Sequence, residues 1–352
     1  MNIATTKAVI NSAHSLHLYS DNYECSLINF FGEFSNKKFQ IEKKKISLIN
    51  FYNKNIINFL PKYGKIKSRF SFIVIYILSF FPLKNLIQKE KPKYLVIHLV
   101  TSLPLTLLIL FSFKTKFILR ISGFPRLNFM RKLFWKIALK KIHLITCPTR
   151  NTMNYIKDLN LADSSKIKLL YDPVISVKDI NKKKKVTFEK HSNYYFSAGR
   201  LTRQKNFMFL CKAFKEIIRE NNEIKLLIAG EGEEGLILKK YINKNRLEKN
   251  IILLGHIQNI YPYLKNSKGF ILTSLWEDPG FVLIEASYSR TSILSANSWP
   301  GPAELIKDEF NGIVFENNNM KSFLNKFKHF ANLKNSHYLK LNNLKLSRKF
   351  TL

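Results

Sequence analysis

Two basic side chains follow a predicted buried strand in the second half of the chain. The run Tyr194–Ala198 is apolar enough for such a strand, and Gly199, Arg200 and Lys205 follow it before a predicted helix. A guanidinium binds phosphate oxygens in a bidentate manner, and an ammonium adds a compact positive charge. The segment therefore suits a diphosphate, and the alternative is two solvated surface cations in a basic protein.

A second candidate lies in the segment Trp276–Glu285, which follows another apolar strand. We expect Asp278 to cap a helix and Pro279 to occupy its first turn. The free N–H groups of Gly280 and Phe281 would then bind a phosphate or a sugar hydroxyl.

Two carboxylates flank this predicted helix start. Glu277 and Glu285 can each accept hydrogen bonds from vicinal hydroxyls. Taken alone, a capped helix with a solvated Glu285 is the alternative.

The run Gly230–Gly235 matches the G-x-G-x-x-G pattern of dinucleotide-binding loops. However, its carboxylates at 231, 233 and 234 would repel a pyrophosphate, and its strand is not the first of a domain. We predict a tight strand-to-helix turn instead.

The chain is strongly basic. Its 58 Lys and Arg against 24 Asp and Glu give a formal net charge of +34 over 352 residues. Such a field attracts nucleic acid, anionic lipid headgroups or phosphorylated small molecules. A lysine-rich proteome explains the same excess equally well, because the lysines are spread along the chain.

Metal and disulfide signals are missing from the sequence. The three cysteines lack C-x-x-C spacing, and there is no Asp-x-Asp and no dense His/Asp group. We therefore predict no metal and no cofactor, and a reducing cytosolic setting. The polar N-terminus lacks the apolar core of a secretory signal.

Apolar strand-like runs alternate with helical patterns, which predicts parallel sheets covered by helices. We expect two doubly wound α/β domains, 1–175 and 191–352, joined by a basic linker at 176–190. The predicted strands are Cys25–Phe30, Tyr94–His98, Phe117–Ile121, Leu144–Cys147, Ile167–Leu170, Tyr194–Ala198, Ile224–Ala229, Ile251–Leu254, Gly269–Leu272 and Ser292–Ser295.

Two apolar stretches approach the length of a membrane span. Tyr94–Phe113 contains Pro104, so we favour a strand, a short helix at Leu103–Phe111 and a second strand over a span. We expect Phe70–Pro82 to be a core helix.

Taken in this order, the segments resemble the group 1, or family 4, retaining glycosyltransferases. The resemblance is specific across Tyr194–Phe315 and weaker over Phe117–Ile175. It rests on a Gly-Arg-Leu strand end, a following Lys, an acidic Gly-x-Gly turn, and Glu277 and Glu285 at Glu-x7-Glu spacing. It implies the two-domain B-type fold, with two Rossmann-like domains facing across a cleft.

The resemblance also implies roles in the donor site. Arg200 and Lys205 would neutralise the donor diphosphate, Glu285 would bind the ribose, and Glu277 would contact the transferred sugar. The Gly280–Phe281 amides would lie near the sugar and phosphate, although Asp278-Pro279 stands where Gly-Phe-Gly is usual. Cations aimed at the departing nucleoside diphosphate stabilise the transition state. Retention of configuration, with front-face attack, is implied as well.

The N-terminal half should hold the acceptor. Arg120 and Gly123 follow a predicted strand, and Arg120 would bind an acceptor phosphate or form a structural ion pair. Many relatives have a His in this area, and this chain has none at that position. Glu304, within a Gly-Pro-x-Glu stretch, is either a supporting residue or a salt-bridged helix residue.

The segment Leu127–Lys141 predicts a basic amphipathic helix. Its apolar stripe consists of Leu127, Met130, Leu133, Phe134 and Ile137, and its cations are Arg126, Arg131, Lys132, Lys136 and Lys140. Such a helix suits a membrane surface, and the alternative is a surface helix whose apolar stripe lies in the core.

We further expect the N-terminal domain to lack its usual first strand. The chain opens with a helix-like segment, Asn2–His17, with Ala8, Ile10, Ala13 and Leu16 on its buried side. The strand Cys25–Phe30 then corresponds to the second strand of the family. A rearranged sheet is the alternative.

These inferences converge on a nucleotide-sugar-dependent glycosyltransferase. It would act on a lipid-linked or polysaccharide acceptor at the cytoplasmic face of the membrane, in cell-surface polysaccharide or lipopolysaccharide synthesis, with no nucleic-acid partner. The alternatives are a nucleotide-sugar epimerase of the same fold and a non-catalytic basic protein that binds membrane or nucleic acid.

Overall fold

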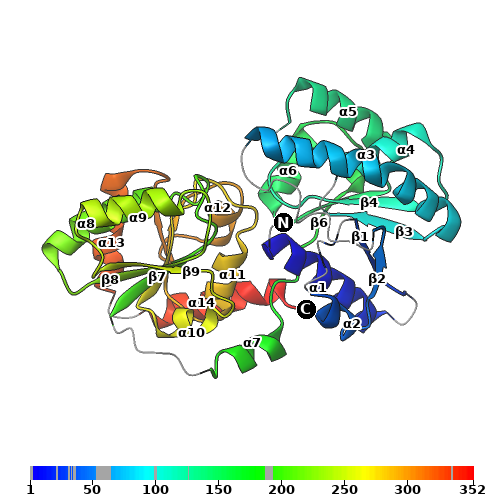
Figure 1. The fold of residues 1–352 in the computed structure, drawn as a ribbon. Helices are drawn as coiled ribbons and strands as arrows, with labels where there is room; N and C mark the ends of the chain where they lie inside the picture. The colour runs from blue at the N-terminus through cyan, green and yellow to red at the C-terminus, as the bar shows by residue number, and fades with distance from the viewer. Residues whose placement is uncertain are drawn as a thin grey trace. The chain divides into compact units, whose positions relative to one another are not determined.

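The chain forms two compact units, Met1–Pro173 and Val174–Leu352 (Figure 1). The computed structural model describes all residues except 1–2, 21–22, 31, 33, 35–36, 53–64, 99–100, 126, 187–192 and 334–335. The boundary falls two residues before the predicted one. The predicted linker is not a plain connector, because it contains helix α7 (Val177–Lys183), which buries Ile180.

The C-terminal unit is built on a six-stranded parallel sheet in the order β12-β11-β10-β7-β8-β9. Its strands are nearly all apolar and buried, as is typical of a parallel sheet covered on both faces. They are β7 (Tyr194–Ala198), β8 (Lys225–Ala229), β9 (Ile251–Gly255), β10 (Gly269–Leu272), β11 (Ile293–Ala296) and β12 (Ile313–Phe315).

The winding of this sheet reverses between β7 and β10. From β7 the chain builds outward through β8 and β9, then returns to pair β10 with the other side of β7. The remaining strands follow on that side. Ligands of doubly wound sheets bind at such a reversal, outside the carboxyl ends of the strands.

Helices connect these strands and cover the sheet. Their apolar sides fill a core that joins the sheet to Phe209, Phe214, Phe323 and Phe327. The helices are α8 (Phe207–Glu220), α9 (Gly235–Lys244), α10 (Tyr261–Asn266), α11 (Phe281–Tyr288), α12 (Gly301–Leu305), α13 (Met320–Ala331) and α14 (His337–Ser347).

The N-terminal unit contains two separate parallel sheets. One pairs β1 (Ser26–Asn29) with β2 (Ser47–Asn50), and the other has the order β3-β4-β5-β6. Among the described residues, no strand joins the two sheets. The second sheet consists of β3 (Tyr94–Ile97), β4 (Lys116–Arg120), β5 (Leu144–Cys147) and β6 (Ile167–Leu169).

The helices described in this unit are α1 (Ile3–Tyr19), α2 (Lys38–Glu42), α3 (Lys65–Glu90), α4 (Ser102–Leu110), α5 (Phe129–Lys140) and α6 (Arg150–Asp158). In α1, Ala8, Ile10 and Ala13 are buried as predicted. Leu16 was wrongly placed in that set, since it lies near the helix end and is 48% exposed.

The apolar stretch Tyr94–Phe113 folds as predicted, into β3 and the buried helix α4. The prediction for Phe70–Pro82 was wrong in part. This segment belongs to α3, but Phe70, Ile77 and Phe81 of its outward face are exposed. By length and composition alone, the described segment Phe70–Glu90 is long and apolar enough to cross a membrane.

Helix α5 turns part of the predicted apolar stripe outward. Met130, Leu133 and Ile137 are exposed, whereas the core takes Trp135 and Leu139 from another side of the same helix. The alternative that this stripe fills the core is therefore wrong for these three residues, whereas Leu127 and Phe134 of the same stripe are partly buried against the core. The helix has a second apolar side, and that side docks on the sheet.

Candidate donor site in the C-terminal unit

An ion pair joins the loops that follow β7 and β10. The Lys205 ammonium donates to Oε1 of Glu277, and the Ser274 hydroxyl donates to the same oxygen at 2.8 Å. The two charged side chains are only 13% and 8% exposed. Because β7 and β10 are parallel neighbours, the pair lies at the carboxyl edge of the sheet, where the winding reverses.

Backbone and amide hydrogen bonds hold these two loops together. The Leu275 amide donates to the carbonyl of Gln204 at 2.8 Å, and the Gln204 side chain donates to the carbonyl of Trp276 at 2.8 Å. The Thr273 hydroxyl donates to the carbonyl of Lys205 at 3.0 Å. The loops therefore form one rigid support for the ion pair.

Gly199 makes room for the Lys205 side chain. A Cβ at position 199 would lie 3.1 Å from Cε of Lys205, tighter than almost all real contacts of that kind. Arg200, the next residue, is exposed. The predicted cations thus differ: Lys205 is partly buried and ion-paired, and Arg200 faces solvent.

The run Gly230–Gly235 forms the predicted strand-to-helix turn between β8 and α9. It is paired with the loop after β7, because the Leu201 amide donates to the carbonyl of Glu231 and the Glu234 amide donates to that of Leu201, both at 2.9 Å. A Cβ at Gly232 would lie 2.3 Å from the Leu201 carbonyl oxygen. This glycine is therefore required for the close approach of two loops.

Helix α11 begins later than the sequence predicted. Its N-cap is Gly280, in the left-handed region with φ 97°, and its first residue is Phe281. The prediction that Asp278 caps the helix and Pro279 opens it was wrong. A residue before proline is disfavoured in the helical region, and the glycine conformation delays the helix start. The Gly280–Phe281 amides still lie at its N-terminal end.

Glu285 is held by a residue that sequence reasoning missed. The buried Tyr261 hydroxyl, at the start of α10, donates to Oε1 of Glu285 at 3.0 Å. Burial, and then the Glu285 charge, raise the pKa of Tyr261, so its phenol stays protonated and remains a donor. No sequence signal could reveal this contact, which joins residues 24 positions apart through packing.

The Pro-Gly-Pro stretch packs beneath Glu277. The Gly301 amide donates to the Glu277 carbonyl at 2.9 Å, and a Cβ at Gly301 would clash with the Pro279 carbonyl. Glu304 follows on α12 and is partly buried. This stretch supports the Glu277 loop through its backbone.

In the N-terminal unit, Arg120 forms the ion pair that the sequence left open. Its guanidinium donates twice to Oδ1 of Asp172, at 2.6 and 3.0 Å, and once to the Leu170 carbonyl at 3.1 Å. Arg120 and Asp172 are both buried. The guanidinium is therefore committed to Asp172 and not presented to a phosphate. Gly123, with φ 110°, has open space around its Cβ position.

A histidine does lie near this position, at the end of the neighbouring strand β3. The Nδ1 atom of His98 is buried and has no hydrogen-bond partner among the described residues. Burial, and then the charge of Arg120, lower the pKa of His98 to about 3. The imidazole is therefore neutral at physiological pH. The sequence prediction of no histidine at the Arg120 loop holds, but it overlooked the adjacent strand.

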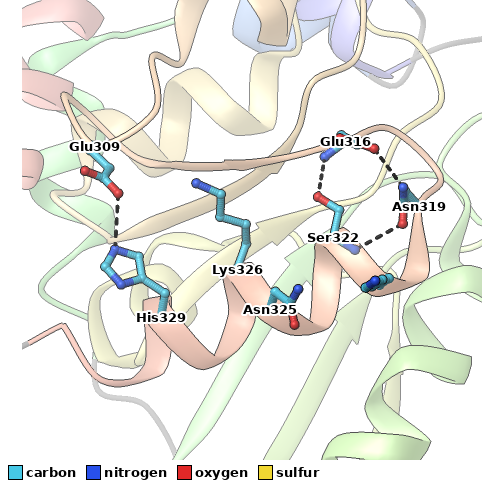
Figure 2. Close-up of a pocket in the computed structure, with 8 residues that line it drawn as sticks. Glu309, Glu316, Asn319, Ser322, Asn325, Lys326 and His329 are labelled. Atoms are coloured by element: carbon cyan, nitrogen blue, oxygen red, sulfur yellow. Dashed lines mark hydrogen bonds and ion pairs between the residues drawn. The ribbon is translucent and has the colours of Figure 1, made fainter.

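A hollow with a volume of about 430 Å³ lies along α13 in the C-terminal unit. Figure 2 shows contacts among the lining residues. Glu309 pairs with His329, the Glu316 carboxylate accepts from the Asn319 side chain, and the Glu316 amide donates to the Ser322 hydroxyl. None of the predicted donor-site residues lines it. Within the described ranges, no cluster of three or more His, Cys, Asp or Glu could hold a metal.

Residues 178–343 match the family model described as Glycosyl transferases group 1. An uncharacterized glycosyltransferase of Methanocaldococcus jannaschii is 28% identical over 320 residues, covering 84% of this chain and 74% of that protein. A UDP-Gal:α-D-GlcNAc-diphosphoundecaprenol α-1,3-galactosyltransferase of Escherichia coli is 36% identical over 160 residues, covering 44% of this chain but only 40% of the enzyme.

Among solved structures, Anabaena HepE in complex with UDP-glucose superposes with a TM-score of 0.70 at 14% identity. The match covers 100% of this chain and 93% of HepE. This likeness shows that the two units share the fold of that protein.

Proposed function

We propose that this chain transfers a sugar from a uridine diphosphate donor to a lipid-linked glycan, because residues 178–343 match the family model of the group 1 glycosyltransferases. The uridine assignment is supported by the similarity to HepE, which was crystallised with UDP-glucose, and to the E. coli enzyme that uses UDP-Gal. The lipid-linked acceptor is supported by the diphosphoundecaprenol substrate of the same E. coli enzyme. Cell-surface polysaccharide synthesis is the setting that such an acceptor implies.

One observation carries the donor assignment: the ion pair of Lys205 and Glu277 lies where the winding of the sheet reverses. The start of α11 and the exposed Arg200 come from loops at this same edge. In the proposed complex, Arg200 and Lys205 contact the diphosphate, and Glu277 contacts the sugar. Glu285 accepts hydrogen bonds from the ribose.

The proposed chemistry follows from charge development. As the glycosidic bond breaks, negative charge grows on the departing diphosphate, and nearby cations stabilise that state more than the bound substrate. Lys205 already neutralises Glu277, so the exposed Arg200 adds net positive charge beside this ion pair. The acceptor attacks from the side that the diphosphate leaves, which retains the anomeric configuration.

A lipid-linked acceptor requires contact with a bilayer. We therefore place the protein at the cytoplasmic face of the membrane, as a peripheral protein. The excess of cations over anions in the chain supports this location, because cytoplasmic leaflets carry a negative surface potential.

Thermal unfolding with a panel of nucleoside diphosphates tests the donor assignment. UDP at a hundred times its dissociation constant should stabilise the folded protein by about 2.7 kcal/mol, which corresponds to about 5–10 °C for a unit of this size. Glu285→Ala should lose most of this shift. Glu248→Ala, at an exposed carboxylate outside the site, is the matched control.

Incubation with UDP-sugars then separates the alternatives. A transferase releases UDP and labels a lipid-linked acceptor. Epimerised UDP-sugar without an acceptor would instead identify an epimerase, and the absence of any nucleotide shift would favour a non-catalytic basic protein.

A further inference from the structure

The outward face of α3 carries an unusual row of large apolar side chains. Phe70, Ile73, Ile77 and Phe81 recur at three- and four-residue intervals and therefore lie on one side of the helix. Each is between 55% and 65% exposed. The row is about 16 Å long, and it lies opposite residues such as Leu83 that pack into the core.

Helix α5 carries a second such face. Phe129, Met130, Leu133 and Ile137 are between 48% and 79% exposed, although the same helix buries Trp135 in the core. An ordinary surface helix has one apolar side and one polar side. This helix has two apolar sides, and only one of them is covered by the described part of the protein.

Helix α4 connects the two exposed faces. The Tyr76 hydroxyl of α3 donates to Thr106 of α4 at 2.7 Å, and Lys141, just after α5, donates to the Ile109 carbonyl at 3.0 Å. Figure 1 shows the three helices gathered on one side of β3 and β4. The helices α3 and α5 thus both pack against α4, and we term their exposed apolar faces together the α3–α5 surface.

The charge of this region points to an anionic partner. Between Glu42 and Asp158, the sequence contains a single acidic residue, Glu90, against 23 lysines and arginines. On α5 the exposed Lys136 and Lys140 lie among the exposed apolar residues, within one turn of Leu133 and Ile137. Large apolar side chains interleaved with cations match the acyl boundary and the headgroups of an anionic bilayer.

We propose that the α3–α5 surface docks the protein on an anionic lipid bilayer, with α3 and α5 lying in the interface. A second copy of the chain is disfavoured as the occupant, because the cations would oppose one another. A span by α3 is disfavoured because Leu83 and Ile87 are buried in the protein core. The proposal deepens the proposed function, since a lipid-linked acceptor resides in such a bilayer, but it depends only on the N-terminal unit.

Vesicle flotation of the full chain tests the proposal. Phosphatidylcholine vesicles with and without phosphatidylglycerol are compared, and we expect binding only to the anionic vesicles, with loss at high salt. Replacing Ile73 and Ile77 together by serine should weaken binding on the order of a hundredfold, because each substitution lowers the affinity for the vesicles about tenfold. Lys136→Ala and Lys140→Ala should each weaken it about fivefold.

Leu236→Ser on α9 is the matched control. Leu236 is 75% exposed in the C-terminal unit, so the same kind of change there should leave vesicle binding unchanged. Equal binding of wild type and the Ile73/Ile77 variant would overturn the proposal, as would a concentration-dependent dimer abolished by that variant. Resistance to alkaline carbonate would also overturn it, in favour of a span.

The test is separate from that of the donor site. The Ile73/Ile77 variant should keep the wild-type melting temperature and its thermal shift with UDP. Loss of vesicle binding with an intact UDP shift therefore supports the docking surface alone. If UDP does not raise the melting temperature of the wild type, this result counts against the proposed function and does not affect the docking proposal.

Discussion

Replacing Lys205 by methionine should destabilise the C-terminal unit before any question of catalysis arises. Methionine keeps the length of the apolar stem but removes the ammonium. The side chain of Glu277 is only 8% exposed. Among the described contacts, the Ser274 hydroxyl would then be the remaining donor to its Oε1 atom. A buried carboxylate without its cation is costly.

The expected loss is on the order of 3–5 kcal/mol, the range found when one partner of a buried ion pair is removed. For a unit of this size, each kcal/mol lowers the melting temperature by about 2–4 °C. The lower bound of 3 kcal/mol therefore corresponds to about 6–12 °C. Differential scanning calorimetry of wild type and Lys205→Met measures this directly.

The double variant Lys205→Met with Glu277→Gln separates stability from chemistry. It removes both charges and keeps both shapes, so most of the lost stability should return. Turnover should nevertheless fall about a hundredfold or more in the single and double variants, because both lack the Lys205 ammonium that contacts the departing diphosphate. A melting temperature for Lys205→Met within 1 °C of wild type would refute the argument that Glu277 depends on this cation.

The other predictions concern the remaining site groups. Arg200→Ala should lower turnover by about a hundredfold with an unchanged melting temperature, because Arg200 is exposed, and wild-type turnover would exclude it from the phosphate site. Glu285→Ala should weaken UDP binding in calorimetry, and Tyr261→Phe should raise KM for the donor with little change in kcat, since it removes only the hydroxyl that orients Glu285. The low pKa of His98 means that the folded state resists its protonation, so this residue costs stability as pH falls from about 6.5 towards 3. Between pH 7 and pH 5, the free energy of unfolding measured in urea should therefore fall by about 2 kcal/mol less in His98→Gln than in wild type. An equal fall in both proteins would contradict a buried, neutral His98.

The buried strands were the easiest part of the fold to predict. In a parallel sheet covered on both faces, a strand such as Tyr194–Ala198 is an unbroken apolar run, and the sequence shows it directly. The strands that were missed are short: β2 (Ser47–Asn50) and β12 (Ile313–Phe315) have four and three residues. Such runs occur by chance in any apolar sequence, and only their pairing partners make them strands.

The surface of the N-terminal unit was harder to predict. Helical periodicity identifies which residues of α5 share a side, but it does not say which side meets the sheet. Leu133 and Trp135 are both apolar, and tertiary packing buries only the second. The same limit explains why α3 was expected to lie in the core.

In the donor site, the sequence predicted the loops better than the contacts. The turn at Gly199 and the spacing of Glu277 and Glu285 are local features. The bond from Tyr261 to Glu285, and the pairing of Lys205 with Glu277 across 72 positions, depend on how strands and helices pack. The misplaced helix cap reflects a backbone conformation at Gly280 that residue preference alone did not reveal.

The placement of this ion pair between β7 and β10 also bears on how the C-terminal unit folds. The strands β7, β8 and β9 follow one another and can pair as the chain proceeds, but the contact of β10 with β7 closes a loop of about seventy residues. Closing a long loop costs entropy before any contact is formed, so such pairings form late. Lys205 and Glu277 remain hydrated until that moment, and the burial of their charges coincides with the closure of the sheet. During synthesis, therefore, no part of the ion pair can form until the ribosome has released the chain through Glu277.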